Sequence, residues 1–289
     1  MQFEHDKVYC CDNIELLKII PDGELNLIYS DILYGTGRKL KDYQDLKANK
    51  QIIYDFYFNR IKELFRVLSS KGSIYLQMDY RISHWMRDMM DEVFGYKNFR
   101  NHIIWPREKS KGAKSKSRQY ARNCDHILFY SKSEEYTWNG CFINYSTEYI
   151  KKRFRPDKNG RLFMDCPMGS HANKPIEELE AEDRIYVTST NGKRYKRYLD
   201  ELSGVAAGDV WDDILPLNSM ALDNTGYSTQ KPKDLMKRII ETSSAPGDLV
   251  ADFFCGSGTC CIVAKELGRK YIGCDTNQNA INITNKGLE

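Results

Sequence analysis

The feature that most constrains the fold of this chain is an apolar run that ends in a glycine-rich turn. Residues 249–254 read LVADFF and predict a buried strand, and the CGSGT that follows opens an apolar pattern with helical spacing. Gly256 and Gly258 permit a tight turn and a close approach of the backbone to a ligand. A strand, a glycine turn and a helix start in this order indicate a Rossmann-like α/β sheet with a ligand site at the turn.

A second predicted strand, at residues 270–275 (KYIGCD), places Asp275 at its carboxyl end. A carboxylate at that end of a strand can accept hydrogen bonds from both hydroxyls of a ribose. The dinucleotide fingerprint requires a third glycine where this chain has Cys261. The two segments therefore favour an adenosyl ligand smaller than a nicotinamide dinucleotide, and they argue against a Rossmann oxidoreductase.

Strand and helix patterns alternate at both ends of the chain. Strands are predicted at residues 7–11, 25–30, 73–78 and 99–105, and helices at 12–20, 52–68, 80–94, 231–244 and 277–286. This order predicts a mostly parallel, twisted sheet with helices on both faces. Between Pro106 and Gly226 the alternation stops, so the strand-like apolar run HILFYS at 126–131 is assigned to an insertion and not to a further βαβ unit.

The segment SDILYG places Asp31 and Tyr34 just after the predicted strand at 25–30. Ligands bind at the carboxyl ends of strands in open α/β sheets. A carboxylate there can accept a hydrogen bond from an exocyclic amine, and the aromatic ring can stack on a base, a contact worth about 1–3 kcal/mol. These residues alone leave open a second interpretation, in which the aspartate lies in a loop and the tyrosine packs in the core.

A strongly basic segment follows at residues 107–122, although the net charge of the chain is only +3. Its cations are Arg107, Lys109, Lys111, Lys114, Lys116, Arg118 and Arg122, against one acid, Glu108. A basic segment without an apolar face predicts a loop that orders on phosphates, with a solvated surface loop as the alternative. A second basic cluster begins at Lys151, Lys152 and Arg153 and is interleaved with aromatic residues.

The composition argues against several classes of protein. The chain has nine cysteines and no C-x-x-C pair, which favours reduced thiols in the cytoplasm and argues against a zinc site or another metal centre. It has no run of 18 apolar residues, so no membrane span is predicted.

The motifs together resemble the permuted, β-class amino-methyltransferases of bacterial restriction–modification systems, which use S-adenosylmethionine (AdoMet). The resemblance lies in TQKP at 229–232, PGD at 246–248, FCGSGT at 254–259 and LGRKYIGCD at 267–275, and, near the other end, in CCDN at 10–13 and SDILY at 30–34. It covers both ends of the chain, and the middle matches only in patches.

The resemblance implies a circularly permuted, Rossmann-like methyltransferase fold with AdoMet as the cofactor and double-stranded DNA as the partner. It implies a catalytic half at 1–106, a basic DNA-contacting loop and strand at 107–138, a target-recognition region at 139–225 and an AdoMet-binding half at 226–289. A homodimer and a cognate restriction endonuclease are further partners compatible with the family.

The resemblance also implies a role for each matching residue. Asp31 and Tyr34 would act on a base flipped out of the helix, with the Ile32 carbonyl as a second acceptor for its amine. AdoMet would be bound by Asp12, Lys231, Asp252, Phe254, Gly256, Ser257, Gly258, Thr259 and Asp275. Within the family, aspartate rather than serine at position 31 favours N6 of adenine.

Two motifs depart from the pattern of the family. The D-P-P-Y motif reads Asp31-Ile32-Leu33-Tyr34, and the proline usual after Asp252 is a phenylalanine. Losing the fixed φ of a proline costs about 0.4–1 kcal/mol through chain entropy, whereas a misplacement of 1 Å can cost about 10²-fold in rate. The alternatives are methylation of cytosine N4 or of an RNA base and, because of Ile32-Leu33, a catalytically weak or inactive homologue that binds DNA or serves as a partner subunit.

Overall fold

The chain divides into two units, one formed by Met1–Gly140 with Gly208–Glu289 and the other by Cys141–Ala207. The computed structural model describes residues 2–40, 42–107, 118–170, 174–217, 224–227 and 229–289. The second unit is shorter than the target-recognition region expected at 139–225, because residues 208–217 belong to the first unit. There the side chains of Trp211 and Ile214 are buried in its core.

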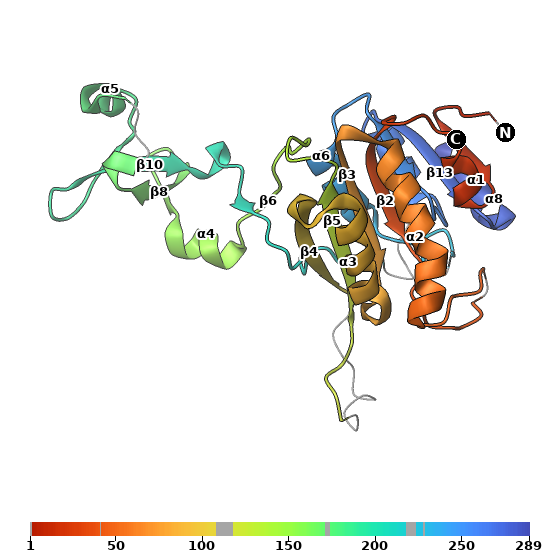
Figure 1. Cartoon of the computed structure of the whole chain (residues 1–289). Coiled ribbons are helices and arrows are strands. Elements are labelled where there is room, and N and C mark those ends of the chain that lie inside the picture. The colour runs from red at the N-terminus through yellow and green to blue at the C-terminus, as the bar shows by residue number, and fades with distance from the viewer. Residues whose placement is uncertain (1, 41, 108–117, 171–173, 218–223, 228) are drawn as a thin grey trace. The chain divides into compact units, whose positions relative to one another are not determined.

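A seven-stranded sheet runs through the first unit (Figure 1). Its order is β1 (Lys7–Cys10), β13 (Lys270–Asp275), β12 (Leu249–Asp252), β2 (Leu25–Asp31), β3 (Leu68–Met78), β5 (Cys124–Ser131) and β4 (Phe99–Pro106). The strands from β1 to β3 in this order pair in parallel, and β5 is antiparallel to both of its neighbours. The predicted mostly parallel sheet is confirmed. Strands β12 and β2, from opposite ends of the chain, lie side by side at its centre.

Helices cover both faces of this sheet, as predicted. One core contains buried residues of α1 (Asn13–Leu17), α2 (Lys50–Val67) and α3 (Tyr80–Phe94). The other contains residues of α6 (Lys233–Ser243), α7 (Thr259–Glu266) and α8 (Gln278–Leu288). Strand β2 serves both cores because its side chains alternate: Ile28 belongs to the first, and Leu27 and Tyr29 to the second.

The assignment of residues 126–131 to an insertion is wrong. These residues form most of β5, which lies between β3 and β4 in the central sheet. The strand is buried along nearly its whole length, and the side chains of Leu128 and Ile127 enter opposite cores. An antiparallel strand needs no crossover helix, so it leaves no strand–helix–strand pattern in the sequence.

The second unit is a small antiparallel structure. Its four-stranded sheet has the order β7 (Arg155–Pro156), β8 (Leu162–Cys166), β10 (Lys193–Tyr198) and β9 (Ile185–Val187). A two-stranded ladder joins β6 (Phe142–Ile143) to β11 (Val205–Ala206), and two short helices are α4 (Thr147–Arg153) and α5 (Ile176–Ala181). The buried side chains of Phe163, Leu179 and Tyr198 supply its apolar interior. Single-turn helices are η1 (Tyr96–Asn98) in the first unit, and η3 (Met168–Ser170) and η4 (Leu199–Glu201) in the second.

Candidate active site

A cavity of about 620 Å³ opens at the carboxyl ends of β1, β2, β12 and β13. This is the edge of an open α/β sheet at which ligands bind, and the volume lies in the usual range for a small-molecule site. Of the residues predicted to be catalytic or to bind the cofactor, all but Tyr34 and Gly258 line it. They are Asp12, Asp31, Ile32, Lys231, Asp252, Phe254, Gly256, Ser257, Thr259 and Asp275. Segments more than 200 residues apart in the sequence thus meet in one cavity.

Asp275 closes the glycine turn from the neighbouring strand. Its Oδ2 accepts a hydrogen bond from the Gly256 backbone N–H at 3.0 Å, and its Oδ1 accepts one from the Asn277 N–H at 2.9 Å. Burial raises the pKa of Asp275 above its ordinary value. Gly256 has a φ of +50°, and a Cβ there would lie 3.1 Å from the ring of Tyr227. The turn therefore requires glycine at this position.

Gly258 has a different part in the turn. Its φ is +75°, and a Cβ there would lie 2.2 Å from Cγ2 of Thr284 on α8. It is not among the residues that line the cavity. The structure therefore places Gly258 at the contact between the turn and α8, where it allows close packing.

Asp12, which also lines the cavity, belongs to a hydrogen-bond network that its motif does not reveal. It caps α1 by accepting from the Ile14 N–H at 3.0 Å, and Nη2 of Arg60 lies 2.8 Å from both of its carboxylate oxygens. Arg60 Nε also donates to Oδ1 of Asn13, whose Nδ2 donates to the Phe253 carbonyl. The CCDN motif contains Asn13, but no local pattern marks Arg60, which is 48 residues from Asp12.

Asp31, at the end of β2, lies between two polar partners. Its Oδ2 forms an ion pair with Nζ of Lys231, and its Oδ1 accepts from the Tyr34 hydroxyl at 2.9 Å. Burial raises the pKa of Asp31, and the Lys231 ammonium opposes that rise. Lys231, a predicted cofactor-binding residue, thus contacts the candidate catalytic carboxylate. This contact joins the predicted cofactor site to the predicted catalytic site.

The two residues that replace the prolines of the family motif are held by hydrogen bonds that proline cannot make. The Ile32 N–H donates to the Gln77 carbonyl and the Leu33 N–H to the Tyr57 hydroxyl, both at 3.0 Å. A hydrogen bond contributes about 0.5–1.5 kcal/mol net, which is similar to the entropic contribution of a proline, about 0.4–1 kcal/mol. The backbone next to Asp31 is therefore anchored by tertiary contacts in place of proline rings.

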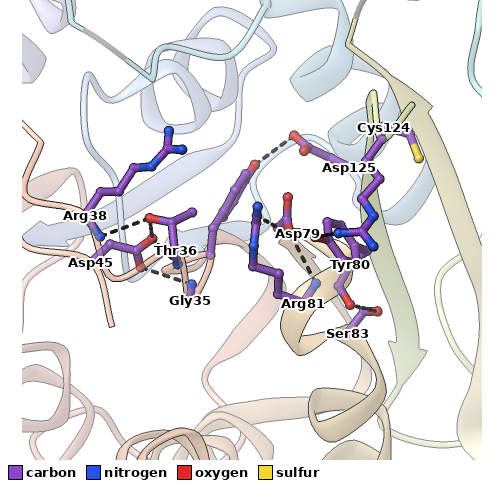
Figure 2. A network of polar contacts seen from close by, with 12 residues as sticks. Gly35, Thr36, Arg38, Asp45, Asp79, Tyr80, Arg81, Ser83, Cys124 and Asp125 are labelled. Carbon is purple, nitrogen blue, oxygen red and sulfur yellow. Dashed lines mark hydrogen bonds and ion pairs between the residues drawn. The ribbon is translucent and has the colours of Figure 1, made fainter. Parts of the chain in front are cut away.

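The loop after Tyr34 is fixed by a buried aspartate (Figure 2). Asp45 accepts from the Gly35 N–H at 3.1 Å and from the Thr36 N–H at 2.8 Å, and it is 3% exposed. Gly35 has a φ of +72°, and a Cβ there would lie 2.7 Å from Cγ2 of Ile82. No sequence pattern marks Asp45, because it is an isolated aspartate in a polar loop.

Asp252, at the end of β12, is the most perturbed acid of the cavity. Burial and, to a smaller extent, the nearby Asp31 carboxylate raise the pKa of Asp252 to about 8, although a hydrogen bond from the Phe254 N–H lowers it. A buried carboxyl group of this kind favours a cationic ligand beside it, because a positive charge stabilises the carboxylate.

Aromatic side chains that the sequence analysis did not select also line the cavity. They include Tyr29, Tyr43 and Tyr227. Burial raises the pKa of each of the three hydroxyls. Tyrosines are spread along the whole chain, so their composition alone gives no signal for these three.

The predicted DNA contacts fall into several environments. Lys109, Lys111, Lys114 and Lys116 lie outside the described residues. Arg107 Nε forms an ion pair at 3.0 Å with the buried Asp125, and its Nη2 lies 3.5 Å from Asp79. Arg107 thus contacts buried carboxylates, while Arg118 and Arg122 are exposed.

A basic and aromatic cleft lies next to Asp79 at the start of α3. Its volume is about 460 Å³, and its walls include Arg38, Tyr80, Arg81, Tyr120 and Arg122. The guanidinium carbons of Arg122 and Arg81 lie 4.2 Å and 4.9 Å from the centre of the Tyr80 ring. Figure 2 shows Tyr80 and Arg81 beside Asp79, and Arg38 beside Asp45. Such a surface suits a phosphodiester with unstacked bases.

In the second unit, Lys151, Lys152 and Arg153 are exposed in the last turn of α4. The stacked rings of Tyr145 and Tyr149, 5.2 Å apart, lie in the same segment. The nearby Arg155 and Arg161 are instead held in ion pairs with acids of this unit. The basic cluster is therefore only partly available to a ligand.

Two further findings concern the described residues alone. They contain no group of three or more His, Cys, Asp or Glu side chains placed to hold a metal ion. They also contain no helix whose length and apolarity would suffice to cross a membrane.

Comparison with known proteins agrees with this geometry. The sequence model of a DNA methylase family matches residues 25–286. The type II methyltransferase M1.MboII of Moraxella bovis is 34% identical, over 98% of this chain and 96% of its own length. M.EcaI of Enterobacter cloacae is 28% identical over 93% of this chain, which spans 66% of that protein. The crystal structure of the M1.HpyAVI–SAM complex superposes with a TM-score of 0.56 at 19% identity, covering 98% of each chain. The resemblance drawn from the motifs is confirmed, and the chain belongs to the N6/N4 family of DNA methylases.

Proposed function

We propose that this chain transfers the methyl group of AdoMet to N6 of an adenine that is flipped out of double-stranded DNA. The observation that carries the proposal is the single cavity that joins Asp31, at the end of β2, to Asp252 and Asp275, at the ends of β12 and β13. Donor and acceptor sites within one cavity allow the two reactants to be held together, and such positioning supplies much of the rate in transfer reactions.

The cofactor half of the cavity fits an adenosyl ligand with a positive charge. Asp275 accepts for the ribose hydroxyls, and Phe254 and Asp12 lie at the adenine end. Lys231 and Asp252 lie toward the methionine end, where the raised pKa of Asp252 marks a carboxyl group that a cation would stabilise. Bound AdoMet supplies an activated methyl group on its sulfonium.

The catalytic half orients the target amine. With Oδ2 of Asp31 held by Lys231, Oδ1 accepts one amine hydrogen, and the Ile32 carbonyl accepts the other. The ring of Tyr34 stacks on the base, which offsets part of the few kcal/mol that unpairing costs. Positioning and electrostatics supply the rate in this scheme.

The bases next to the flipped adenine are proposed to lie on the cleft around Tyr80, with the phosphodiester along Arg38, Arg81 and Arg122. Arg107 does not line this cleft, and its contact with DNA stays a prediction, because Arg81 in the cleft pairs with Asp79 as Arg107 does. Arg118 and the lysines of the segment 109–116 remain predicted phosphate contacts. Replacing Arg81 or Arg122 by glutamine should weaken DNA binding for all sequences and lower the log–log salt slope by about 1 each.

The second unit is proposed to contribute to target recognition, with Lys151, Lys152 and Arg153 on the DNA. Action on DNA favours the cytoplasm as the site of the reaction. A homodimer and a cognate endonuclease remain predictions.

The test is transfer of labelled methyl from AdoMet to mixed-sequence duplex DNA, followed by nucleoside analysis of the product. We expect N6-methyladenine. N4-methylcytosine would overturn the choice of base and leave the rest of the scheme in place. Absence of transfer to DNA, with AdoMet binding retained, would contradict the proposal and favour a partner subunit.

A further inference from the structure

A buried carboxylate that the proposed function does not use lies directly behind the catalytic pair. Asp125, at the start of β5, is 1% exposed and lies at one end of the polar network in Figure 2. Burying a carboxylate is costly unless partners compensate it. Its contacts therefore indicate what it does.

Three neighbours hold this carboxylate in place. Its Oδ2 accepts from the Tyr34 hydroxyl at 2.7 Å and from Nε2 of Gln77 at 2.8 Å, and its Oδ1 pairs with Arg107 Nε at 3.0 Å. The amide of Gln77 is itself fixed, because its Oε1 accepts from the Tyr29 hydroxyl at 2.7 Å. Asp125 thus has a defined position relative to Tyr34.

The Tyr34 hydroxyl lies between two carboxylates but has one proton to donate. It is 2.9 Å from Oδ1 of Asp31 and 2.7 Å from Oδ2 of Asp125. Since Lys231 contacts Oδ2 of Asp31, Oδ1 is the oxygen that remains for a target amine. A carboxylate oxygen can accept two hydrogen bonds, but one from the tyrosine hydroxyl weakens Oδ1 as an acceptor for the amine, unless the hydroxyl donates to another group.

We propose that Asp125 is a positioning residue that accepts the Tyr34 hydroxyl proton and so leaves Oδ1 of Asp31 free to accept from the target amine. The same hydrogen bond fixes the plane of the Tyr34 ring on which the base stacks. Asp125 acts through Tyr34 and does not touch the substrate. This inference rests on the proposed function, because it assigns the amine to Asp31.

The inference predicts that the effect of losing Asp125 depends on the tyrosine hydroxyl. Asp125→Asn keeps the size of the side chain but weakens the acceptor, so the Tyr34 hydroxyl stays on Asp31. We expect kcat to fall about 10- to 100-fold, the range of a small misplacement at the reacting centre, with the Kd for AdoMet unchanged. Tyr34→Phe should cost less than Asp125→Asn, because the ring remains and Oδ1 is free.

The double variant Asp125→Asn/Tyr34→Phe gives the decisive comparison. Without the hydroxyl there is no competition, so we expect it to be more active than Asp125→Asn and close to Tyr34→Phe. If the decrease in kcat of the double variant equals the product of the decreases in the two single variants, the inference is overturned, because Asp125 then acts independently of the hydroxyl. If Asp125→Asn fails to fold, Asp125→Glu, which shifts the acceptor by one methylene, should show the same rescue by Tyr34→Phe.

A matched control lies elsewhere in the same unit. Asp91 on α3 accepts from the Tyr130 hydroxyl at 2.5 Å, outside the cavity. Asp91→Asn should leave kcat and the Kd for AdoMet unchanged, and a comparable loss of kcat would overturn the assignment of a specific role to Asp125. An unmodified protein that transfers no methyl group would contradict the proposed function itself. If the unmodified protein is active but the decreases in kcat of the two single variants multiply in the double variant, only this inference is contradicted.

Discussion

The adjacent strand ends of β12 and β2 are held in two different ways. The end of β12 turns through two glycines of its own sequence, Gly256 and Gly258, which have a positive φ, and Asp275 and Thr284 from β13 and α8 contact this turn. The end of β2 is held by distant side chains: Tyr57 and Gln77 anchor the backbone after Asp31, and Asp125, 91 residues from Tyr34, holds its hydroxyl. The turn after β12 therefore tolerates little change at its two glycines. The end of β2 tolerates replacement of both prolines of the D-P-P-Y motif, because distant side chains hold its backbone.

A change in the glycine turn should lower stability clearly. Gly258→Ala places a Cβ about 2.2 Å from Thr284 and also meets a φ of +75°, so overpacking should lower the free energy of unfolding by about 1–3 kcal/mol. Gly268→Ala is the matched control, because its φ is +73° and nothing lies within 4 Å. Urea unfolding of both variants isolates the packing contribution. An equal decrease in the free energy of unfolding for Gly258→Ala and Gly268→Ala would show that α8 does not constrain the turn.

The carboxyl group at the end of β12 should make stability depend on pH. With the folded pKa of Asp252 at about 8 and an ordinary value of 3.8, the folded state keeps a proton that the unfolded state loses. The free energy of unfolding should therefore fall, through this group, as the pH rises from about 4 to about 8, by up to about 1.4 kcal/mol per unit.

Asp252→Asn imitates the protonated carboxyl and should remove that contribution. Urea unfolding at pH 5.5 and pH 8, without AdoMet, measures it. The stability of the asparagine variant relative to the unmodified protein should be greater at pH 8 than at pH 5.5. An equal difference at both values would contradict the shifted pKa.

The smallest effect should come from restoring the motif of the family. Ile32→Pro/Leu33→Pro would add conformational restriction but remove the two N–H donors to Gln77 and Tyr57. Because these contributions nearly cancel, we expect the free energy of unfolding to change by about 1 kcal/mol or less and kcat by only a small factor. A large gain in kcat would show that the tertiary anchors do not replace the prolines.

This contrast also explains what the sequence could predict. Gly256, Asp275 and Asp31 could be predicted from the sequence because each lies in a short motif at the end of an apolar strand. The residues that support the site were not: Arg60 and Asp125 lie 48 and 91 residues from Asp12 and Tyr34, the residues that they hold, and carry no local pattern.

The prediction of the fold failed for the same reason at one place. Helices that alternate with parallel strands revealed most of the sheet, but β5 reaches the sheet by an antiparallel return and was assigned to the insertion. Likewise, Arg107 belongs to a basic run by composition, while its contacts with Asp125 and Asp79 depend on the tertiary structure.

The most direct test of the central claim compares AdoMet binding and methyl transfer in Asp31→Ala. If the end of β2 orients the amine while β12 and β13 bind the cofactor, transfer should fall by at least about 10²-fold. The Kd for AdoMet, measured by calorimetry on the same sample, should stay within a small factor of the original. Undiminished transfer, or loss of AdoMet binding together with transfer, would contradict this division of the site.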